Sequence, residues 1–400
     1  MLEMNQGEEI FLILCLLYLS DCILWVRRGS VAIVGGLFKV SPKMASPIFG
    51  TGRWGLIPLN VLPPSGRAFN CHFMPFSISP FGISITNSRM MGDPISRDPL
   101  YHSFETDGKG TITRNEDEVH INNRKWYVFG NSDQAKRIAS LLIELMNMPM
   151  QMRNSVIQKY WDDQFNYDEA LTLLIQFRGS IKNVVPLTYG LFLLIFIVSP
   201  LTAYMFGLAI AIIVLVPLVF GLSIILSIKY NLLARLNNSQ SRHGRIIEII
   251  RMIGCPPIAI RVLDLISLDL LSKYNCSLIS HMFMSDDQYR EYASKLYRNL
   301  KYPIGESNMD EEERKIFRSD NGYATAAMER FLLSRGYDPL EFMRAPSVKS
   351  ETSRSYCPRC LSEFTFSIGK CSDCDGIELQ LFENDESCGG GRKPSGPRTR

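Results

Sequence analysis

The longest feature of the hydropathy pattern is a run of residues without charge. Residues 183–228 contain no Asp, Glu, Lys, Arg or His. As one helix these 46 residues would measure about 69 Å, whereas the hydrocarbon core of a bilayer is roughly 30 Å thick. Because backbone groups must pair internally in lipid, the run predicts a transmembrane helical hairpin with spans at 185–203 and 206–228. The break between them is expected at Pro200, which lacks an amide hydrogen, and at Tyr204, which suits the interface.

The alternative for this run is a hairpin buried in the core of a soluble protein. Helices of soluble proteins almost always carry a polar stripe on the side that faces solvent. Neither half of the run has such a stripe, so the pattern favours the membrane.

A second apolar segment lies near the N-terminus, at 10–26, with Asp21 as its only acid. Acidic residues precede it, and Arg27 and Arg28 follow it, so it lacks the basic start of a signal peptide. Residues 1–28 are therefore predicted to contain an uncleaved transmembrane helix. The alternative is a hydrophobic helix, or a helix–strand pair, packed against the other spans, because a lone carboxylate is costly in lipid.

Basic residues near the apolar segments predict the orientation, because positively charged flanks stay in the cytoplasm. The hairpin has basic residues on both outer flanks and none in its central loop: Arg178, Lys182, Lys229, Arg235, Arg242 and Arg245. Under the rule for a bacterial inner membrane, the N-terminus is expected outside, and the large domains and the C-terminus are expected in the cytoplasm.

The stretch before the hairpin combines strands and helices. Residues 29–80 are rich in Gly and Pro, which predicts short strands and loops. Within 81–148, short alternating runs separated by turns at 107–108 and 122–123 predict a meander, and a helix with apolar residues at helical spacing over 135–145 follows. This order of strands and one helix resembles the bacterial pleckstrin-homology-like domains. The resemblance implies a domain that binds lipids or peptides, or one that only supports the structure.

Helices are expected to dominate the other soluble parts. Helical patterns cover 151–162, 168–178 and almost all of 240–343. Within the last range, Arg261, Asp264 and Ser267 recur every three residues along one stripe. Core packing is one interpretation of this stripe, and a helix lying on the membrane surface is the other.

The cysteines are concentrated near the C-terminus, where Cys357 and Cys360 form one C-x-x-C pair and Cys371 and Cys374 form another. Each pair can form a tight turn that presents two thiolates to one metal ion. The two turns together give a tetrahedral sulfur shell, which suits zinc. With the alternating residues between them, the pairs resemble a zinc ribbon of the four-cysteine type over 356–383, and we expect a structural zinc ion.

Two alternatives to zinc stay open: a pair of disulfides, if this end of the chain were outside the cell, and an iron site of the rubredoxin type. The rubredoxin motif usually has a glycine directly after the second C-x-x-C, whereas Asp375 here precedes Gly376. Four thiolates leave no open position for water, so the metal is expected to be structural rather than catalytic. Cys388, in the Gly-rich tail, is not expected to be a ligand.

The balance of charge argues against nucleic-acid binding. Lys plus Arg is 43 and Asp plus Glu is 40, a formal net charge of +3, whereas a chain-wide nucleic-acid binder would have a strong basic excess. Acidic residues oppose the basic residues around the ribbon, so no phosphate-binding face is indicated.

No catalytic constellation emerges from the motifs. Residues 50–55 match G-x-G-x-x-G literally, but Pro58, Pro63 and Pro64 disfavour the helix that must follow in a dinucleotide-binding loop. The sequence contains no G-x-x-x-x-G-K-[ST], H-E-x-x-H or G-x-S-x-G motif. An enzyme of unknown reaction therefore stays an alternative without assigned residues.

The patterns together predict a membrane α-helical protein, with a hairpin and an N-terminal span, a cytoplasmic α+β domain, an all-α domain and a small zinc ribbon. The expected segments are the N-terminal apolar segment 1–28, the α+β domain 29–182, the hairpin 183–229, the helical domain 230–344, a linker 345–355, the ribbon 356–383 and a disordered tail 384–400.

As a whole the chain resembles uncharacterised bacterial membrane proteins. The favoured role is binding, scaffolding or regulation in a membrane complex, with the bilayer and a protein as partners. The alternatives are a membrane-embedded enzyme, a transporter subunit and a membrane-tethered nucleic-acid binder.

Overall fold

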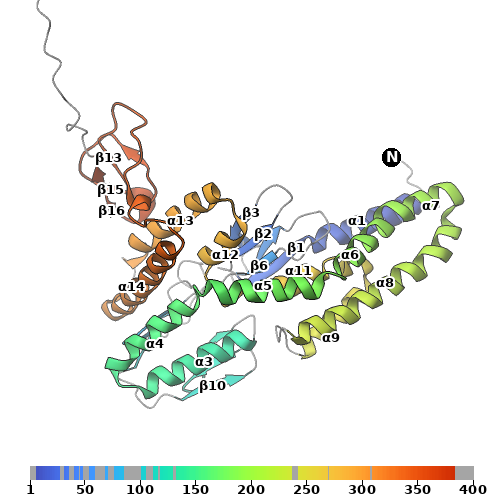
Figure 1. Ribbon diagram of the computed structural model, residues 1–400, viewed down its shortest axis with the longest axis horizontal. Coiled ribbons are helices and arrows are strands. Elements are labelled where there is room, and N and C mark those ends of the chain that lie inside the picture. Colours follow the sequence, from blue (N-terminus) through green and yellow to red (C-terminus); the bar gives the residue numbers. More distant parts are fainter. Residues whose placement is uncertain are drawn as a thin grey trace, which may run out of the picture. The chain divides into compact units, whose positions relative to one another are not determined.

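The computed structural model consists mostly of helices, with small antiparallel sheets (Figure 1). It describes residues 6–27, 31–35, 40–44, 46–47, 54–58, 68–70, 76–84, 101–104, 111–115, 118–128, 132–236, 242–268, 270–306 and 309–382. Some predictions fall outside these ranges: the turn at 107–108, most of the loop at 50–55, and the tail at 384–400 with Cys388.

The chain divides into two compact units. Met1–Arg290 and Asp310–Phe331 form the first unit, and Glu291–Met309 and Leu332–Arg400 form the second. Two helices contribute to both units, α13 (Asp286–Lys301) and α14 (Glu311–Ser334). The segment expected to be one helical domain, 230–344, is therefore divided between the units.

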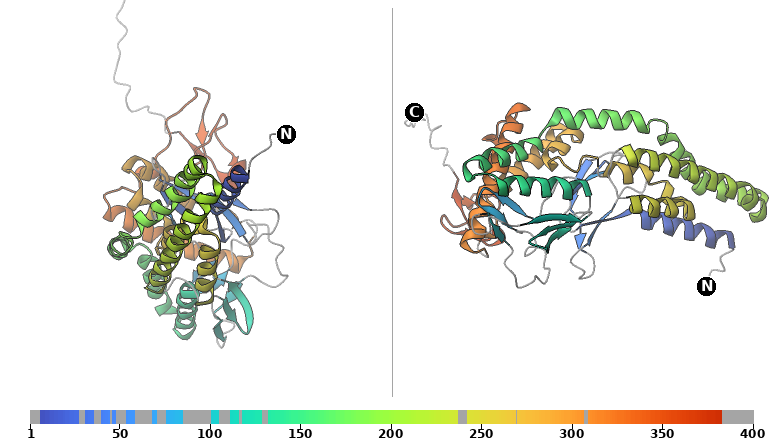
Figure 2. Two further views of the ribbon diagram at one scale, coloured as in Figure 1. Left: turned by 90° about the vertical axis from the view of Figure 1, so that its right-hand side faces the viewer. Right: turned by 90° about the horizontal axis from the view of Figure 1, so that it is seen from below.

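The uncharged run forms two apolar helices that are long enough to cross a membrane, Val185–Phe206 and Leu208–Arg235. The first is built from α6 (Val185–Leu193), a π-helical turn η1 (Leu194–Val198) and α7 (Ser199–Phe206), and the second is α8 (Leu208–Leu236). Gly207 separates α7 from α8 with a φ of +88°, a conformation that only glycine adopts easily. Figure 2 shows these two helices, the limbs of the hairpin, from two further directions.

The prediction of a break at Pro200 is wrong, because the helix continues through this residue to Phe206. A proline cannot donate to the carbonyl four residues before it. The wider π-helical turn of η1 ends two residues before Pro200, as is typical where the regular helical pattern is interrupted. The Ser199 hydroxyl donates to the Leu194 carbonyl at 2.7 Å, so it adds a bond across the same turn.

The N-terminal apolar segment is divided between a helix and a strand. Helix α1 (Gln6–Asp21) ends before strand β1 (Ile23–Arg27), so the prediction of one helix across 10–26 is wrong and the helix–strand alternative holds. Strand β1 is rich in aromatic and β-branched residues and pairs with β5 (Trp54–Pro58) in an antiparallel register. The apolar part of α1, Phe11–Ser20, is shorter than an ordinary membrane span.

Strands also occupy the Gly- and Pro-rich stretch, as predicted for its described residues. The other strands here are β2 (Val31–Gly35), β3 (Val40–Met44), β4 (Ser46–Pro47) and β6 (Ala68–Asn70). They form two sheets with the strand orders β1-β5-β4 and β3-β2-β6. The second sheet contacts α11 (Val262–Leu268) and α12 (Cys276–Phe283), where Phe69 stacks on Phe283 with ring centroids 4.8 Å apart.

The predicted meander and its following helix are confirmed for the described residues. The sheets have the orders β7-β8-β9 and β10-β11-β12, with strands Ser77–Ser79, Gly82–Ser84, Tyr101–Ser103, Ile112–Asn115, Glu118–Ile121 and Arg124–Val128. Asn122 and Asn123 have φ values of 52° and 61°, as in the tight turns that favour hairpins. Helix α3 (Ser132–Asn147) buries Leu142 in the same core as Ile83.

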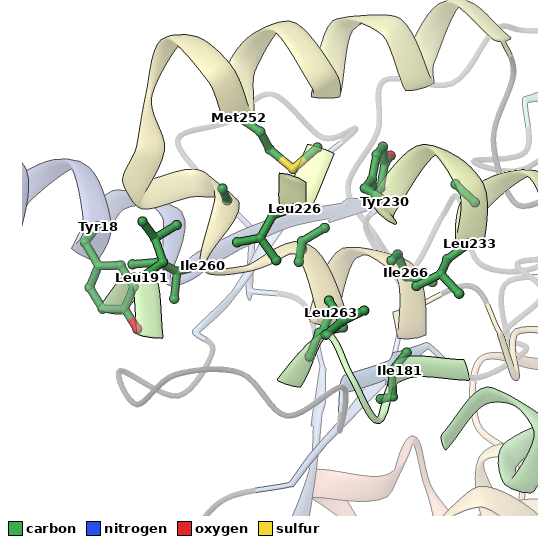
Figure 3. Packing of buried hydrophobic residues seen from close by; sticks show 14 of the residues in the cluster. Tyr18, Ile181, Leu191, Leu226, Tyr230, Leu233, Met252, Ile260, Leu263 and Ile266 are labelled. Carbon is green, nitrogen blue, oxygen red and sulfur yellow. The ribbon is translucent and has the colours of Figure 1, made fainter. Parts of the chain in front are cut away.

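The remaining helices agree with the predicted helical ranges. They are α4 (Met150–Asp163), α5 (Tyr167–Ile181), α9 (Arg242–Gly254) and α10 (Pro256–Ala259), besides α11 to α14. Helix α8 has 29 residues and is about 44 Å long, which exceeds the thickness of a hydrocarbon core. Its last turns bury Leu226 and Tyr230 in a cluster that contains Met252 of α9 and Leu263 of α11 (Figure 3).

The polar stripe of Arg261, Asp264 and Ser267 is buried, which confirms the core-packing interpretation. Arg261, only 1% exposed, donates to Asp264 Oδ2 at 3.3 Å, and also to the Tyr18 hydroxyl at 3.1 Å and to Cys22 Sγ at 2.7 Å. A buried charge must be paired to be tolerated, so these contacts hold the end of α1 against the segment that begins α11.

Candidate metal centre

The four cysteines lie on two similar turns of the second unit. Cys357 follows strand β13 (Ser355–Tyr356), and its amide donates to the Ser362 carbonyl at 2.9 Å. Cys371 ends strand β15 (Lys370–Cys371), and its carbonyl accepts from the Gly376 amide at 3.1 Å. Each C-x-x-C sequence is therefore closed by a backbone bond that turns both of its thiols to one side.

Residues with positive φ end both turns. After Cys360 the chain passes through Leu361, with a φ of 61°, and after Cys374 through Asp375 and Gly376, with φ values of 51° and 79°. The left-handed conformation reverses the chain and returns it to a strand after each pair of cysteines. The position of Asp375 before Gly376, noted in the sequence as a departure from the rubredoxin pattern, thus still gives a left-handed turn.

Short strands join the two turns. Strand β13 lies between β14 (Glu363–Phe364) and β17 (Gln380–Leu381), and β15 pairs with β16 (Ile377–Glu378). The residues between the cysteine pairs do not form a hairpin of their own, because β14 and β15 lie in different sheets. Each cysteine turn instead connects two paired strands, β13 with β14 and β15 with β16.

The four Sγ atoms all lie within 4.8 Å of one another, and those of Cys360 and Cys371 are 3.7 Å apart. A zinc–sulfur distance near 2.3 Å implies edges of about 3.8 Å in a tetrahedral sulfur shell. All four are free thiols, without a disulfide between them. The arrangement can hold a metal ion, and its soft donor set fits zinc or iron.

The thiols differ in how readily they ionise. Burial opposes ionisation of Cys360, but its hydrogen bonds with the Ser362 side chain and backbone, and with the Cys357 and Cys374 thiols, lower its pKa to about 7. Burial, followed by the neighbouring thiols, raises the pKa of Cys374, and burial also raises that of Cys371. The cluster therefore resists carrying several negative charges by itself, and a divalent cation would relieve this repulsion.

Arg359 supplies positive charge beside the cluster. Burial lowers the pKa of its guanidinium, while the thiols of Cys374, Cys357 and Cys360 raise it. The side chain is fixed by a hydrogen bond to the Tyr302 carbonyl. A zinc ion with four thiolates has a net charge of −2, so a guanidinium at this place offsets part of it.

Residues 302–305, which lie outside the predicted ribbon 356–383, pack against it and form hydrogen bonds with it. The Gly305 amide donates to Asp375 Oδ2 at 2.9 Å, and Gln380 Nε2 donates to the Tyr302 hydroxyl at 3.0 Å. Ile304 packs on the buried cysteines together with Phe364. The sequence of 302–305 does not predict this role, because these residues lie more than fifty positions before the ribbon residues that they contact.

The expected linker 345–355 also contributes to the ribbon. The Lys349 amide donates to the Glu363 carboxylate at 3.1 Å, and the Arg354 amide donates to the Phe364 carbonyl at 2.9 Å. Ser355 already belongs to β13. The segment is therefore not only a linker, because its backbone amides donate hydrogen bonds to the ribbon.

No family model, curated protein or solved structure matches this chain. The resemblance of 81–148 to pleckstrin-homology-like domains thus remains one of element order. The metal site is thus inferred from the geometry of the four cysteines alone.

Proposed function

We propose that this chain is an integral membrane protein in which a structural zinc ribbon and the helical segments around it form a binding or scaffolding component of a membrane complex. One observation carries the membrane part of this proposal. In the most apolar window of each hairpin helix, only 17% of the residues are buried. A core helix of a soluble protein is mostly buried, so an apolar solvent is the better explanation of this surface.

The proposed orientation has the hairpin turn and the N-terminus outside, and it has the second unit and the parts of the first unit beyond the hairpin and α1 in the cytoplasm. Tyr204, beside the turn, is 91% exposed, as suits an aromatic residue at the membrane interface. Phe11 packs on Phe196 and Tyr18 packs on Phe192, so α1 runs antiparallel to the first limb. Its N-terminal end therefore lies toward the turn, which agrees with the orientation that the basic flanks predict.

The orientation is tested by labelling introduced cysteines in intact cells with a thiol reagent that cannot cross membranes. We expect Tyr204→Cys to be labelled from outside, and Ser350→Cys, an exposed position of the second unit, to be labelled only after permeabilisation. Labelling of Ser350→Cys in intact cells would reverse the proposed topology.

Zinc is the proposed metal because four thiolates complete its tetrahedral shell. Such a site has no open position, so the ion is proposed to stabilise the ribbon and not to carry a reaction. The pairing of this ribbon with 302–305 then presents a folded surface to a partner. On the ribbon itself, Ile368 is 90% exposed and Phe366 is 47% exposed, and exposed apolar side chains of this size are typical of protein contacts.

The partner role is tested by affinity purification from mild detergent, with Ile368→Asp as the variant. Leu340→Asp is the matched control, because Leu340 is a 73% exposed apolar residue of the same unit outside the ribbon. We expect a protein that copurifies with the wild type and with Leu340→Asp to be lost from Ile368→Asp. If the same proteins accompany all three chains, Ile368 of the ribbon is not part of the contact. If none copurifies, the scaffolding role gives way to the enzyme and transporter alternatives.

A further inference from the structure

The hairpin and α1 enclose an apolar groove of about 890 Å³ in the first unit. Its walls come from five elements: Phe11 of α1, Ile195 of η1, Ala203 of α7, Ala211 and Leu215 of α8, and Pro256 of α10. Among the lining residues Glu8 is the only charged one, and it lies with Tyr204 toward the hairpin turn. The groove is thus apolar along its length, with polar groups gathered toward one end.

The sequence explains why the two limbs leave room here. Small side chains at Ala203 and Ala211 face the space from opposite limbs, and Ala211 is buried. Pro217 interrupts the hydrogen-bond ladder of α8 nearby, and the π-helical turn η1 changes the course of the other limb. These features prevent the close interdigitation that would otherwise fill a gap between two apolar helices.

The apolar lining of the groove indicates what can occupy it. Water would find few partners there, because the Ser199 hydroxyl already donates to the Leu194 carbonyl. An empty space of this volume would forfeit the dispersion energy of its whole lining. The groove adjoins strongly exposed apolar residues, such as Ile213 at 73% and Leu218 at 55%, so in the proposed membrane setting its surroundings are hydrocarbon.

We propose that the groove is a binding site for one acyl chain of a bilayer phospholipid. This inference rests on the proposed membrane location. The headgroup lies at the end with Glu8 and Tyr204, at the outer interface, and the chain extends between α1, α7 and α8 toward Pro256. The apolar lining recognises the chain, while the polar end fixes its direction.

The proposal is tested in vesicles of phosphatidylethanolamine and phosphatidylglycerol that contain a phospholipid with a photoactivatable group on its acyl chain. The full-length protein is irradiated, and labelled residues are mapped by mass spectrometry. In the wild type we expect several-fold heavier labelling of groove residues such as Ala203 and Leu14 than of the exposed Ile213 and Leu218. Equal labelling of these two groups would overturn the proposal without any variant.

Two variants sharpen the test by filling the groove from opposite walls, Ala211→Trp and Ala203→Phe. Each should abolish the excess labelling of the groove, whereas Ile213→Trp, on the exposed face, should leave it unchanged. Unchanged groove labelling in both filling variants would also overturn the site. Weaker labelling of the groove residues than of Ile213 and Leu218 would also overturn the proposal, because it would mean that something other than lipid fills the groove. Failure of the wild type to float with the vesicles would remove the membrane location itself, and this result is distinguishable from even labelling.

Discussion

The hairpin and the four-cysteine ribbon differ in how much apolar surface their own residues can bury. The hairpin has abundant apolar surface, but most of each apolar window stays exposed. The ribbon has almost no apolar core besides three buried cysteines and a few neighbours, including Ile304 and Ile377. One region thus has more hydrophobic surface than the chain can cover, and the other has too little to fold alone.

Both regions are consequently expected to depend on something outside the chain. A bilayer would cover the hairpin, and a metal ion would link the two turns of the ribbon. A third region, around Asp320 in the first unit, needs neither, because it is buried and hydrogen-bonded by the protein itself. The following predictions separate these three cases, beginning with the largest expected effect.

Removal of one cysteine should abolish the ribbon. We expect Cys371→Ser to lose the metal, because the free energy of binding structural zinc is on the order of 10–16 kcal/mol and supplies the folding energy. Elemental analysis should find one zinc per wild-type chain and none in the variant, and the ribbon should become protease-sensitive. The control is Cys276→Ser in α12, which should retain zinc. Iron in the wild type would support the rubredoxin alternative, and zinc retained by Cys371→Ser would refute the four-cysteine site.

Asp320 should make the stability of the first unit depend on pH. Burial raises its pKa from 3.8 to about 7, against the opposing hydrogen bonds from the Trp161 side chain, the Ile78 backbone and the Ser77 side chain. Because the folded state holds the proton more tightly than the unfolded state, this group's stabilising contribution is full below about pH 4. It falls as the pH rises to about 7, by at most about 4 kcal/mol.

The measurement is the unfolding temperature of wild type and Asp320→Asn between pH 4 and pH 8. The amide cannot ionise, so the variant should lack this part of the decline toward neutral pH. Asp287→Asn, at an exposed position of α13, serves as the matched control and should follow the wild type. Parallel pH profiles for wild type and Asp320→Asn would mean that Asp320 does not titrate in this range.

A charge on the exposed face of the hairpin should impair membrane insertion. Ile213 in α8 and Leu340 in the second unit are both 73% exposed. If lipid covers the hairpin, Ile213→Lys costs about 3 kcal/mol, whereas Leu340→Lys in water costs almost nothing. We expect alkaline extraction of membranes to release more of the first variant than of the second. Equal release of the two variants would indicate that water, not lipid, surrounds Ile213.

Several features follow from the sequence because their cause is local. The absence of charge over 183–228 dictates apolar helices, whatever they pack against. The turn at Asn122 and Asn123 and the strands beside it follow from short-range alternation and turn chemistry. The four cysteines meet because the two C-x-x-C pairs are close in the sequence and each is held by a short antiparallel pair of strands.

Other features depend on residues far apart in the chain. The N-terminal segment is a helix followed by a strand because β1 pairs with β5. The hydropathy of the segment does not predict this pairing. Arg261 is a buried residue because Tyr18 and Cys22 receive its hydrogen bonds. The support of the ribbon by Tyr302 and Gly305 is equally remote from the cysteines in sequence. Periodicity predicts which face of an element is apolar, whereas the partner of that face is decided only when the chain has folded.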